Sequence, residues 1–321
     1  MPRRVSVLVL AILLASSGFG VALAQHTPSV PADALVLAPF ADPKGPLQAQ
    51  APSDAEMQER AKKLIANQHR DDAALEQYER IERHLDRTGG ANPRTIEQKT
   101  FRIVPTGIGE TKLLLQDRGR PTDPAEYHRQ LQGLASVLEL ALKPDDPRTK
   151  AASTKWQKRK RDRADLVDAA GDAFFRKWQG RETLNGHDCD VVELDPNPSF
   201  HPHSLLQEVL THATAKIWVD HTRDQLVRGE AHIARDFSVG GGILGKLYRG
   251  GVFSMEQAEV APGIWLPTRY QFDFTGRKFI FMFEEHQLIE AAQFRRVESP
   301  QQTLAHVQNE LAGGKVTGGD P

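Results

Sequence analysis

The chain has 321 residues, with 41 Lys and Arg against 42 Asp and Glu, and a single Cys. A formal charge of −1 at pH 7 argues against a surface that binds nucleic acid as a whole. One Cys excludes an internal disulfide framework, so stability must come from a hydrophobic core, and the chain is long enough to bury one.

The first 24 residues have the three parts of a secretory signal peptide. Two arginines precede an apolar run over Val5–Leu14, and an A-x-A cleavage pattern ends at Ala24. The apolar run is too short to span a bilayer comfortably. We therefore predict an exported, periplasmic protein that is cleaved after Ala24 and does not span the membrane.

Residues 25–52 are rich in Pro, Ala and Gln without a sustained period, which predicts a flexible linker. Ser53 or Asp54 can cap a helix that runs to about Asn67. A second helix is predicted over Asp71–Leu85, because its apolar residues recur at helical spacing.

Strands are predicted over Thr95–Val104 and Thr111–Gln116. A helix with a wide apolar stripe begins at Pro124, and it could either plug or gate a cavity against the sheet. The basic run Trp156–Arg163 is interpreted as a solvated charged surface. Asn-Gly at position 185 predicts a hairpin turn between two further strands.

From Ala213 onward, alternating apolar and polar residues predict an antiparallel meander of half-buried strands. The predicted strands are residues 213–220, 226–237, 252–260 and 264–274, and Thr275-Gly276-Arg277 is predicted to close a hairpin to the last strand. With the preceding helices, the meander predicts one α+β domain over residues 53–297. Residues 298–321 are predicted to be mostly disordered, apart from a helix-forming patch at Thr303–Leu311.

The last two strands of the meander carry an unusually aromatic face. Arg269, Gln271 and Asp273 fall on the other side, so we predict one solvated face and one apolar face that helices or a ligand must cover. The predicted ligand-binding residues are Leu266, Tyr270, Phe272, Phe274, Phe279, Phe281 and Phe283.

Two stretches resemble a known family. The strand Lys216-Ile217-Trp218-Val219-Asp220, with the turn and charged strand after it, and the Trp265-Leu266-Pro267 entry to the last strands are similar to the LolA-like outer-membrane lipoprotein-sorting superfamily. This resemblance extends over about residues 71–297. It implies an incomplete, half-barrel β-sheet, covered by helices around an apolar cavity that binds the acyl chains of a lipid or of a lipoprotein.

Catalytic and metal-binding motifs are weak. There is no Gly-x-Ser-x-Gly elbow, and the His and Cys residues between His187 and His212 have no known metal-ligand spacing. We therefore predict no enzyme activity, no cofactor and no metal. A metal-dependent or hydrolytic enzyme that uses this region is retained as a third hypothesis.

The first hypothesis is a periplasmic binder or carrier of a hydrophobic ligand, either a lipid or an acylated lipoprotein, in an apolar cavity. The alternative is an envelope sensor or protein-interaction module whose core is filled by its own helices. The first predicts a lipid or lipidated partner, and the second predicts an envelope protein.

Overall fold

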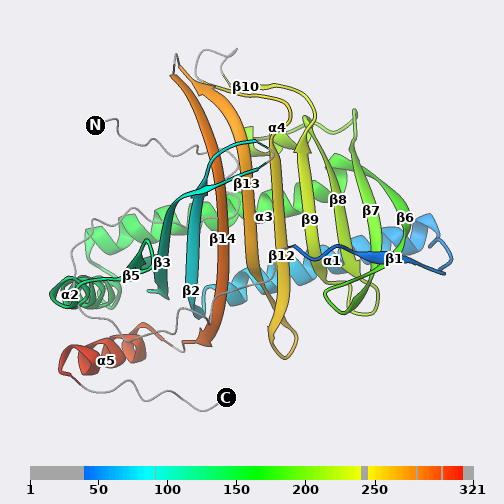
Figure 1. Ribbon diagram of the computed structural model, residues 1–321. Helices are drawn as coiled ribbons and strands as arrows, with labels where there is room; N and C mark the ends of the chain where they lie inside the picture. Colours follow the sequence, from blue (N-terminus) through cyan, green and yellow to red (C-terminus); the bar gives the residue numbers. More distant parts are fainter. Residues whose placement is uncertain (1–39, 91, 240–244, 280, 298, 314–321) are drawn as a thin grey trace.

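The computed structural model describes residues 40–90, 92–239, 245–279, 281–297 and 299–313. Within these residues, fourteen strands form one antiparallel sheet and five helices accompany it (Figure 1). The predicted signal peptide lies outside this part of the chain.

The helices are α1 (Asp54–Leu75), α2 (Pro124–Ala141), α3 (Pro147–Ala173), α4 (Leu205–Leu210) and α5 (Pro300–Leu311). The strands are β1 (Lys44–Leu47), β2 (Tyr78–Arg87), β3 (Thr95–Pro105), β4 (Glu110–Asp117), β5 (Arg120–Pro121), β6 (Phe174–Leu184), β7 (His187–Pro196), β8 (Ala213–Asp220), β9 (Leu226–Ile233), β10 (Phe237–Val239), β11 (Gly245–Leu247), β12 (Val252–Ala261), β13 (Ile264–Lys278) and β14 (Phe281–Arg296).

Hydrogen-bonded neighbours follow the order β1-β6-β7-β8-β9-β12-β13-β14-β2-β3-β4-β5, and the short pair β10 and β11 joins β13. Among the described strands no pairing joins β1 to β5, so the sheet stays open. The predicted α+β class and incomplete barrel are confirmed.

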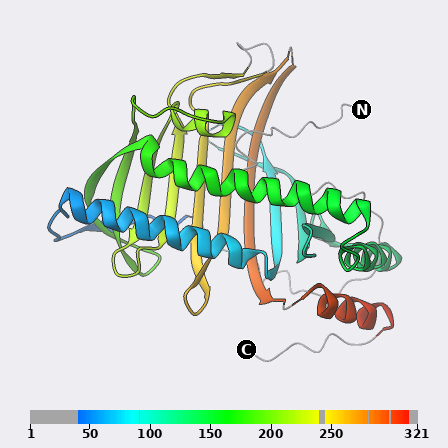
Figure 2. The same cartoon turned by 180° about the vertical axis from the view of Figure 1, so that it is seen from behind.

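The helices cover both faces of the sheet. Helices α1 and α3 run side by side across the strands on one face (Figure 2), and α4 lies against α3 and β8 on the same face. Ile289 points to that face, because it shares a core with Val209 of α4. Its cross-strand partner on β2 is His84, which therefore points to the same face. Ile81 is three residues before His84 on β2, so its side chain points to the opposite face. There Ile81 shares a core with α2 and α5, through Leu134 and Val307.

Local sequence signals set several element boundaries. Ser53 and Glu56 form a capping box at the start of α1, as the predicted cap requires. Pro124 begins α2 and Pro147 begins α3, where the missing N–H of proline has no helical partner to lose. Asn185 and the glycine after it both have positive φ, at 51° and 84°, which confirms the predicted turn between β6 and β7.

The predicted aromatic residues of β13 and β14 lie on one face of the sheet, as the pairing of the two strands shows. Phe283 pairs with Gly276, two residues beyond Phe274, so it shares the side of Tyr270 and Phe272. Helices and neighbouring strands cover much of this face, and the core there includes Val209 of α4.

One predicted helical assignment is wrong. Residues 78–85 do not continue a second helix, because α1 ends at Leu75 and β2 begins at Tyr78. Polar side chains hide the strand period there, since β2 buries Arg80 and Glu82 as an ion pair. The basic run Trp156–Arg163 lies in the middle of the 27-residue helix α3, where Lys158 and Arg161 are exposed to solvent as predicted.

The hairpin predicted at Thr275–Arg277 is also misplaced, because β13 continues to Lys278 and pairs with β14 up to Phe281. Phe279, which was predicted to continue the aromatic strand face, instead has a positive φ of 52° beyond the end of β13. The turn is therefore farther along the chain than the Thr-Gly pair suggested.

The face predicted to be solvated is largely buried as well. Across it, cross-strand neighbours alternate in charge through Arg228, Glu256, Arg269, Glu290 and Arg83. The Arg228 Nε to Glu256 Oε1 distance is 2.9 Å and the Arg83 Nε to Glu290 Oε2 distance is 2.8 Å. Opposite charges on adjacent strands stabilise one another, which explains how a sheet can bury them.

Residues 40–47 lie against this charged face and are not a detached linker. The Phe40 ring lies 4.1 Å from the Arg269 guanidinium carbon and 5.1 Å from that of Arg228. Arg228 also donates to the carbonyl of Ala41, and β1 pairs with β6. The sequence predicted none of these contacts, because a stretch of Pro, Ala and Gln shows no period.

None of the helices in the described ranges is long and apolar enough to cross a membrane.

Candidate functional site

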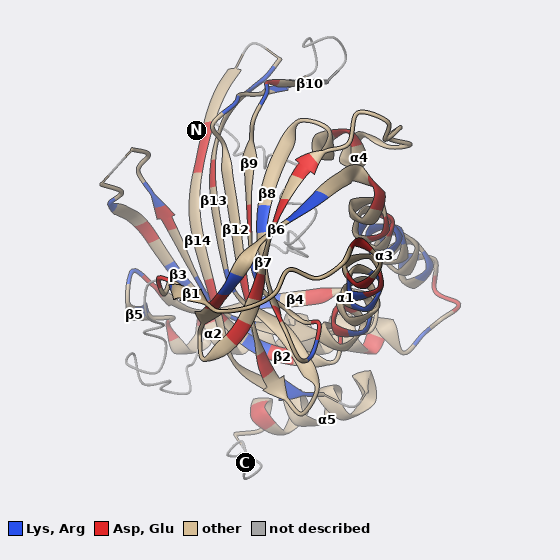
Figure 3. Ribbon diagram, turned by 90° about the vertical axis from the view of Figure 1, so that its right-hand side faces the viewer, with Lys and Arg blue, Asp and Glu red and all other residues tan. Residues whose placement is uncertain are grey.

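A cavity of about 320 Å³ lies between the helices α1 and α3 and the sheet. Figure 3 shows these two layers facing each other, with the helices on one side and the strands on the other. The helices and strands β6, β7, β8, β9 and β12 all contribute side chains. Its apolar lining includes Met57, Ala61, Leu64, Ile65, Leu166, Val167, Ala170, Trp178, Val192, Leu194, Ile217, Val219, Leu226, Phe253 and Met255.

The polar residues of the cavity lie at its two ends and along one side. Arg163 of α3 forms an ion pair with Asp72 of α1 at 2.7 Å, beside Gln68. Helices α1 and α3 run in opposite directions, so the first turns of α1 lie near the last turns of α3 (Figure 2). There Arg176 of β6 contacts both helices: it donates to the Gly171 carbonyl at 2.7 Å and to the Gln58 side chain at 3.4 Å.

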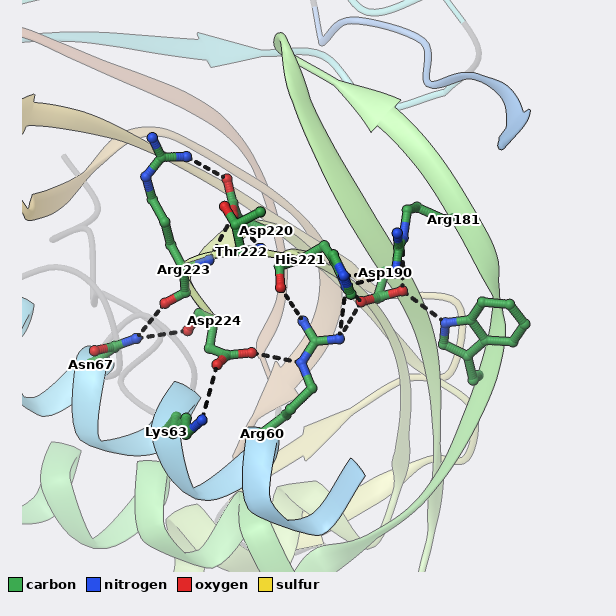
Figure 4. A network of polar contacts seen from close by, with 11 residues as sticks. Arg60, Lys63, Asn67, Arg181, Asp190, Asp220, His221, Thr222, Arg223 and Asp224 are labelled. Atoms are coloured by element: carbon green, nitrogen blue, oxygen red, sulfur yellow. Dashed lines mark hydrogen bonds and ion pairs between the residues drawn. The ribbon is translucent and has the colours of Figure 1, made fainter. Parts of the chain in front are cut away.

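Along one side of the cavity, Arg60 fastens α1 to the sheet and to the β8–β9 turn (Figure 4). Its guanidinium donates to Asp224 at 2.6 Å, to the His221 carbonyl at 3.3 Å, and to Asp190 of β7. About two turns of helix later, the Asn67 side chain donates to the Asp224 carbonyl at 2.8 Å. These contacts fix the separation between α1 and the sheet, and the cavity lies between them.

Asp190 is the acceptor at the centre of this network. It also accepts from Trp178 Nε1 at 3.0 Å, Arg181 Nε at 3.2 Å and His221 Nδ1 at 2.8 Å. Burial disfavours its charge, but the donors from Arg60, Trp178 and His221 outweigh burial and lower the pKa of Asp190 to about 2. The carboxylate is therefore charged at any pH near neutrality.

Because of this network, the free energy of unfolding should decrease at acidic pH. A carboxyl whose pKa is lowered in the folded state contributes above its unfolded pKa, near 3.8, and loses that contribution as pH falls to about 2. We expect the Asp190 contribution to be about 2 kcal/mol, since one pKa unit corresponds to about 1.4 kcal/mol. Urea unfolding between pH 5 and pH 2.5 should show a smaller loss for Asp190→Asn than for the wild type. Parallel pH profiles for the two proteins would contradict this assignment.

Four of the seven predicted binding residues, Leu266, Tyr270, Phe272 and Phe274, are buried. Tyr270 and Phe272 are buried and pair across strands with Met255 and Phe253, which do line the cavity. The Phe253 and Phe272 ring centroids are 5.3 Å apart. Phe274 lies farther along the same core, and Leu266 packs against Leu75 and Tyr78 at the end of α1.

The remaining predicted residues lie near the tip of the β13–β14 hairpin, which extends past the neighbouring strands (Figure 1). Phe279 is 50% exposed and Phe281 is 71% exposed, while Phe283 packs against the core. None of the seven predicted residues lines the cavity itself. That they bind a ligand stays a prediction.

Sequence reasoning missed the helical half of the lining and the polar network. The amphipathic start of α1 was predicted, but nothing local links Arg60 with Asp190, which is 130 residues later. The one available signal was the alternation of Val192, Ile217 and Val219 in strands whose predicted partners adjoin one another. The helix after Pro124, proposed as a plug or a gate, contributes nothing to the cavity, because α2 packs on the other face.

The region proposed for metal binding has other contacts. His187 Nδ1 lies 3.0 Å from Asp220, and the His212 ring meets the edge of Phe237. Cys189 is buried, and burial together with the nearby Asp220 charge raises the pKa of its thiol to about 12. Across the described ranges, no three His, Cys, Asp or Glu side chains converge in a way that could hold a metal ion.

No family model matches the chain, and no curated protein sequence matches it significantly. Solved structures that match the chain include the "putative outer membrane lipoprotein-sorting protein domain" of Vibrio parahaemolyticus, with 10% identity, a TM-score of 0.31, and coverage of 78% of this chain and 99% of that chain. A LolA superfamily protein from Nitrosomonas europaea has 10% identity, a TM-score of 0.28, and coverage of 79% and 98%. A DUF1329 family protein from Desulfovibrio piger has 13% identity, a TM-score of 0.28, and coverage of 74% and 92%.

Proposed function

We propose that this protein binds the acyl chain of a lipid or of a lipidated protein, as a binding or carrier protein and not as an enzyme. The observation that supports the proposal is the apolar cavity between α1, α3 and five strands of the sheet. Its volume of about 320 Å³ lies at the lower end of the range for small-molecule sites. Each methylene transferred from water into such a site contributes about 0.8 kcal/mol.

The proposed setting is the periplasm, with the signal peptide removed after Ala24. The residues that support this setting are the paired arginines, the short apolar run and the A-x-A pattern at the start of the chain. In that aqueous compartment, the cavity would shield a poorly soluble acyl chain from water.

The test is to fill the cavity. Ala170→Phe on α3 places a ring where the cavity has only a methyl group, so we expect binding of palmitate and of hexadecanol to fall at least about tenfold, the loss of roughly two buried methylenes. Native mass spectrometry of the detergent-free protein with each ligand measures it. The matched control is Ala151→Phe, which makes the same change at an exposed position of the same helix.

If wild-type protein takes up neither ligand, or if Ala170→Phe binds both as tightly as Ala151→Phe does, the cavity is not an acyl site. Thermal unfolding of both variants should be recorded alongside, because a folded Ala170→Phe protein is needed for the comparison.

A second candidate function rests on a different observation. Phe279, Phe281 and Met282 expose large apolar surfaces together at the β13–β14 tip, at 50%, 71% and 60%. Exposed apolar clusters of this kind mark surfaces that bind a protein or a membrane. An envelope protein that docks there would make the chain an interaction module, and Phe281→Asp would abolish capture of that partner without changing acyl binding.

A further inference from the structure

The cavity has a direction, which follows from the strands that line it. Trp178 of β6, Val192 of β7, Ile217 of β8, Leu226 of β9 and Phe253 of β12 all face it. These five strands are neighbours, so the lining crosses four inter-strand spacings of about 4.8 Å, or about 19 Å. An elongated apolar space of small volume suits one extended acyl chain that lies parallel to α1 and α3.

The two ends of this space differ in charge. At the end near the middle of the sheet, the Arg163 guanidinium is neutralised by Asp72. Along the side, Arg60 is neutralised by Asp190 and Asp224. Each of these cations already has a carboxylate partner.

Arg176, at the β6 end, has no such partner among the residues that the structure describes. Its contacts in the described part of the chain are the Gly171 carbonyl and the Gln58 amide oxygen, both of which are neutral. The side chain is half-buried and lines the cavity, so its charge faces an apolar space without a nearby anion. A guanidinium has five donors in a fixed fork that fits a carboxylate or a phosphate, and two contacts leave donors available.

The geometry points to an anionic headgroup site at Arg176, so that the cavity takes a single-chain acyl lipid with a carboxylate or phosphate head. This inference rests on the proposed acyl-binding function and names its ligand class. The head binds at the β6 end, next to the first turns of α1, and the chain extends towards Phe253 and Met255. An uncharged acyl lipid would fill the same apolar space but would leave the Arg176 charge without a counter-ion.

The experiment compares palmitate with hexadecanol, which has the same chain length and no charge, by native mass spectrometry below the aggregation limit of either ligand. We expect wild-type protein to bind palmitate about 10-fold to 100-fold more tightly, because a hydrogen bond to a charged group contributes about 1.5–3 kcal/mol. Arg176→Gln should remove this preference and leave hexadecanol binding unchanged. Arg176→Lys, which keeps the charge, should retain part of it.

The matched control is Lys177→Gln, because Lys177 is the next residue of β6, points to the other face and lies near Glu193. It should keep the preference for palmitate. A preference that survives Arg176→Gln, or that Lys177→Gln removes equally, would overturn the headgroup site. Binding of both ligands with equal affinity to wild type would overturn it too, while leaving the acyl-binding function intact.

Lysophosphatidate with a palmitoyl chain distinguishes the two kinds of head. If its affinity depends on Arg176 as palmitate affinity does, the site accepts phosphate as well as carboxylate. If it binds tightly and Arg176→Gln changes nothing, the anionic head is held elsewhere and the inference fails.

Discussion

Phe272→Ala is expected to lower the free energy of unfolding by about 3–5 kcal/mol. The ring is 2% exposed and lies between Phe253 and Phe274, with centroid distances of 5.3 and 6.5 Å. Removing it leaves a hole in a core formed by seven strands and α4, which cannot collapse without moving the sheet. Urea denaturation followed by circular dichroism measures the change.

Phe281→Ala provides the comparison, because the sequence places both residues on one aromatic face. Phe281 is 71% exposed at the hairpin tip, so its removal should change stability by no more than about 0.5 kcal/mol. Equal losses for the two variants would mean that the tip is buried in solution. A small loss for Phe272 would mean that its ring faces a ligand site and not a packed core.

Arg102→Met is expected to cost about 3–5 kcal/mol, because removal of one partner of a buried ion pair leaves the other charge buried. Arg102 Nε donates to Glu79 at 2.9 Å, and its Nη1 donates to Glu310 at 2.9 Å and to the Tyr127 hydroxyl at 3.0 Å. This guanidinium therefore joins β3 to β2, α5 and α2. Urea denaturation of the variant would show the loss as an earlier unfolding midpoint.

Arg295→Met is the matched control, since Arg295 also donates to Glu79, at 2.9 Å. Its side chain is 41% exposed against 9% for Arg102, so water already screens its charge. We expect it to cost at most about 1 kcal/mol. If the exposed arginine proved as costly as the buried one, the α2 and α5 side of the sheet would not depend on Arg102.

Periodicity was sufficient where each strand buries one apolar face. Residues 213–220 and the strand that begins at Ile264 alternate clearly, and both are strands in the structure. The Asn-Gly turn and the Ser53 cap are similarly local, because the residues that make the contacts are three or fewer positions apart. Such signals need no partner from elsewhere in the chain.

Periodicity failed where the buried residues are charged. In β2, Arg80 is neutralised by Glu110 of β4 at 2.8 Å, and Arg83 is paired with Glu290 of β14. Without those partners the segment looks like an amphipathic helix, since Tyr78, Ile81 and Leu85 recur every three to four residues. The sequence contains both members of each pair but no sign of which residues meet.

The cavity was the least predictable feature. The sequence indicated an apolar cavity only through a family resemblance, and it assigned the lining to the aromatic strands β13 and β14. The lining instead comes from strands nearer the other edge of the sheet and from α1 and α3, whose separation from the strands is fixed by contacts such as Arg60 with Asp190. A void is defined by the distance between layers, and no single segment contains that distance.

By itself, therefore, the sequence determined the α+β class, the strand meander, the helix caps and the aromatic face, because each of these depends on residues close together in the chain. The tertiary structure decided which aromatic residues are buried, where the sheet accepts charge, and which end of the cavity carries Arg176, whose contacts among the described residues are neutral. Those properties arise from layers and ion pairs between different segments, some of them more than a hundred residues apart, such as Arg60 with Asp190 and Arg83 with Glu290, whose positions are set only when the whole sheet is assembled.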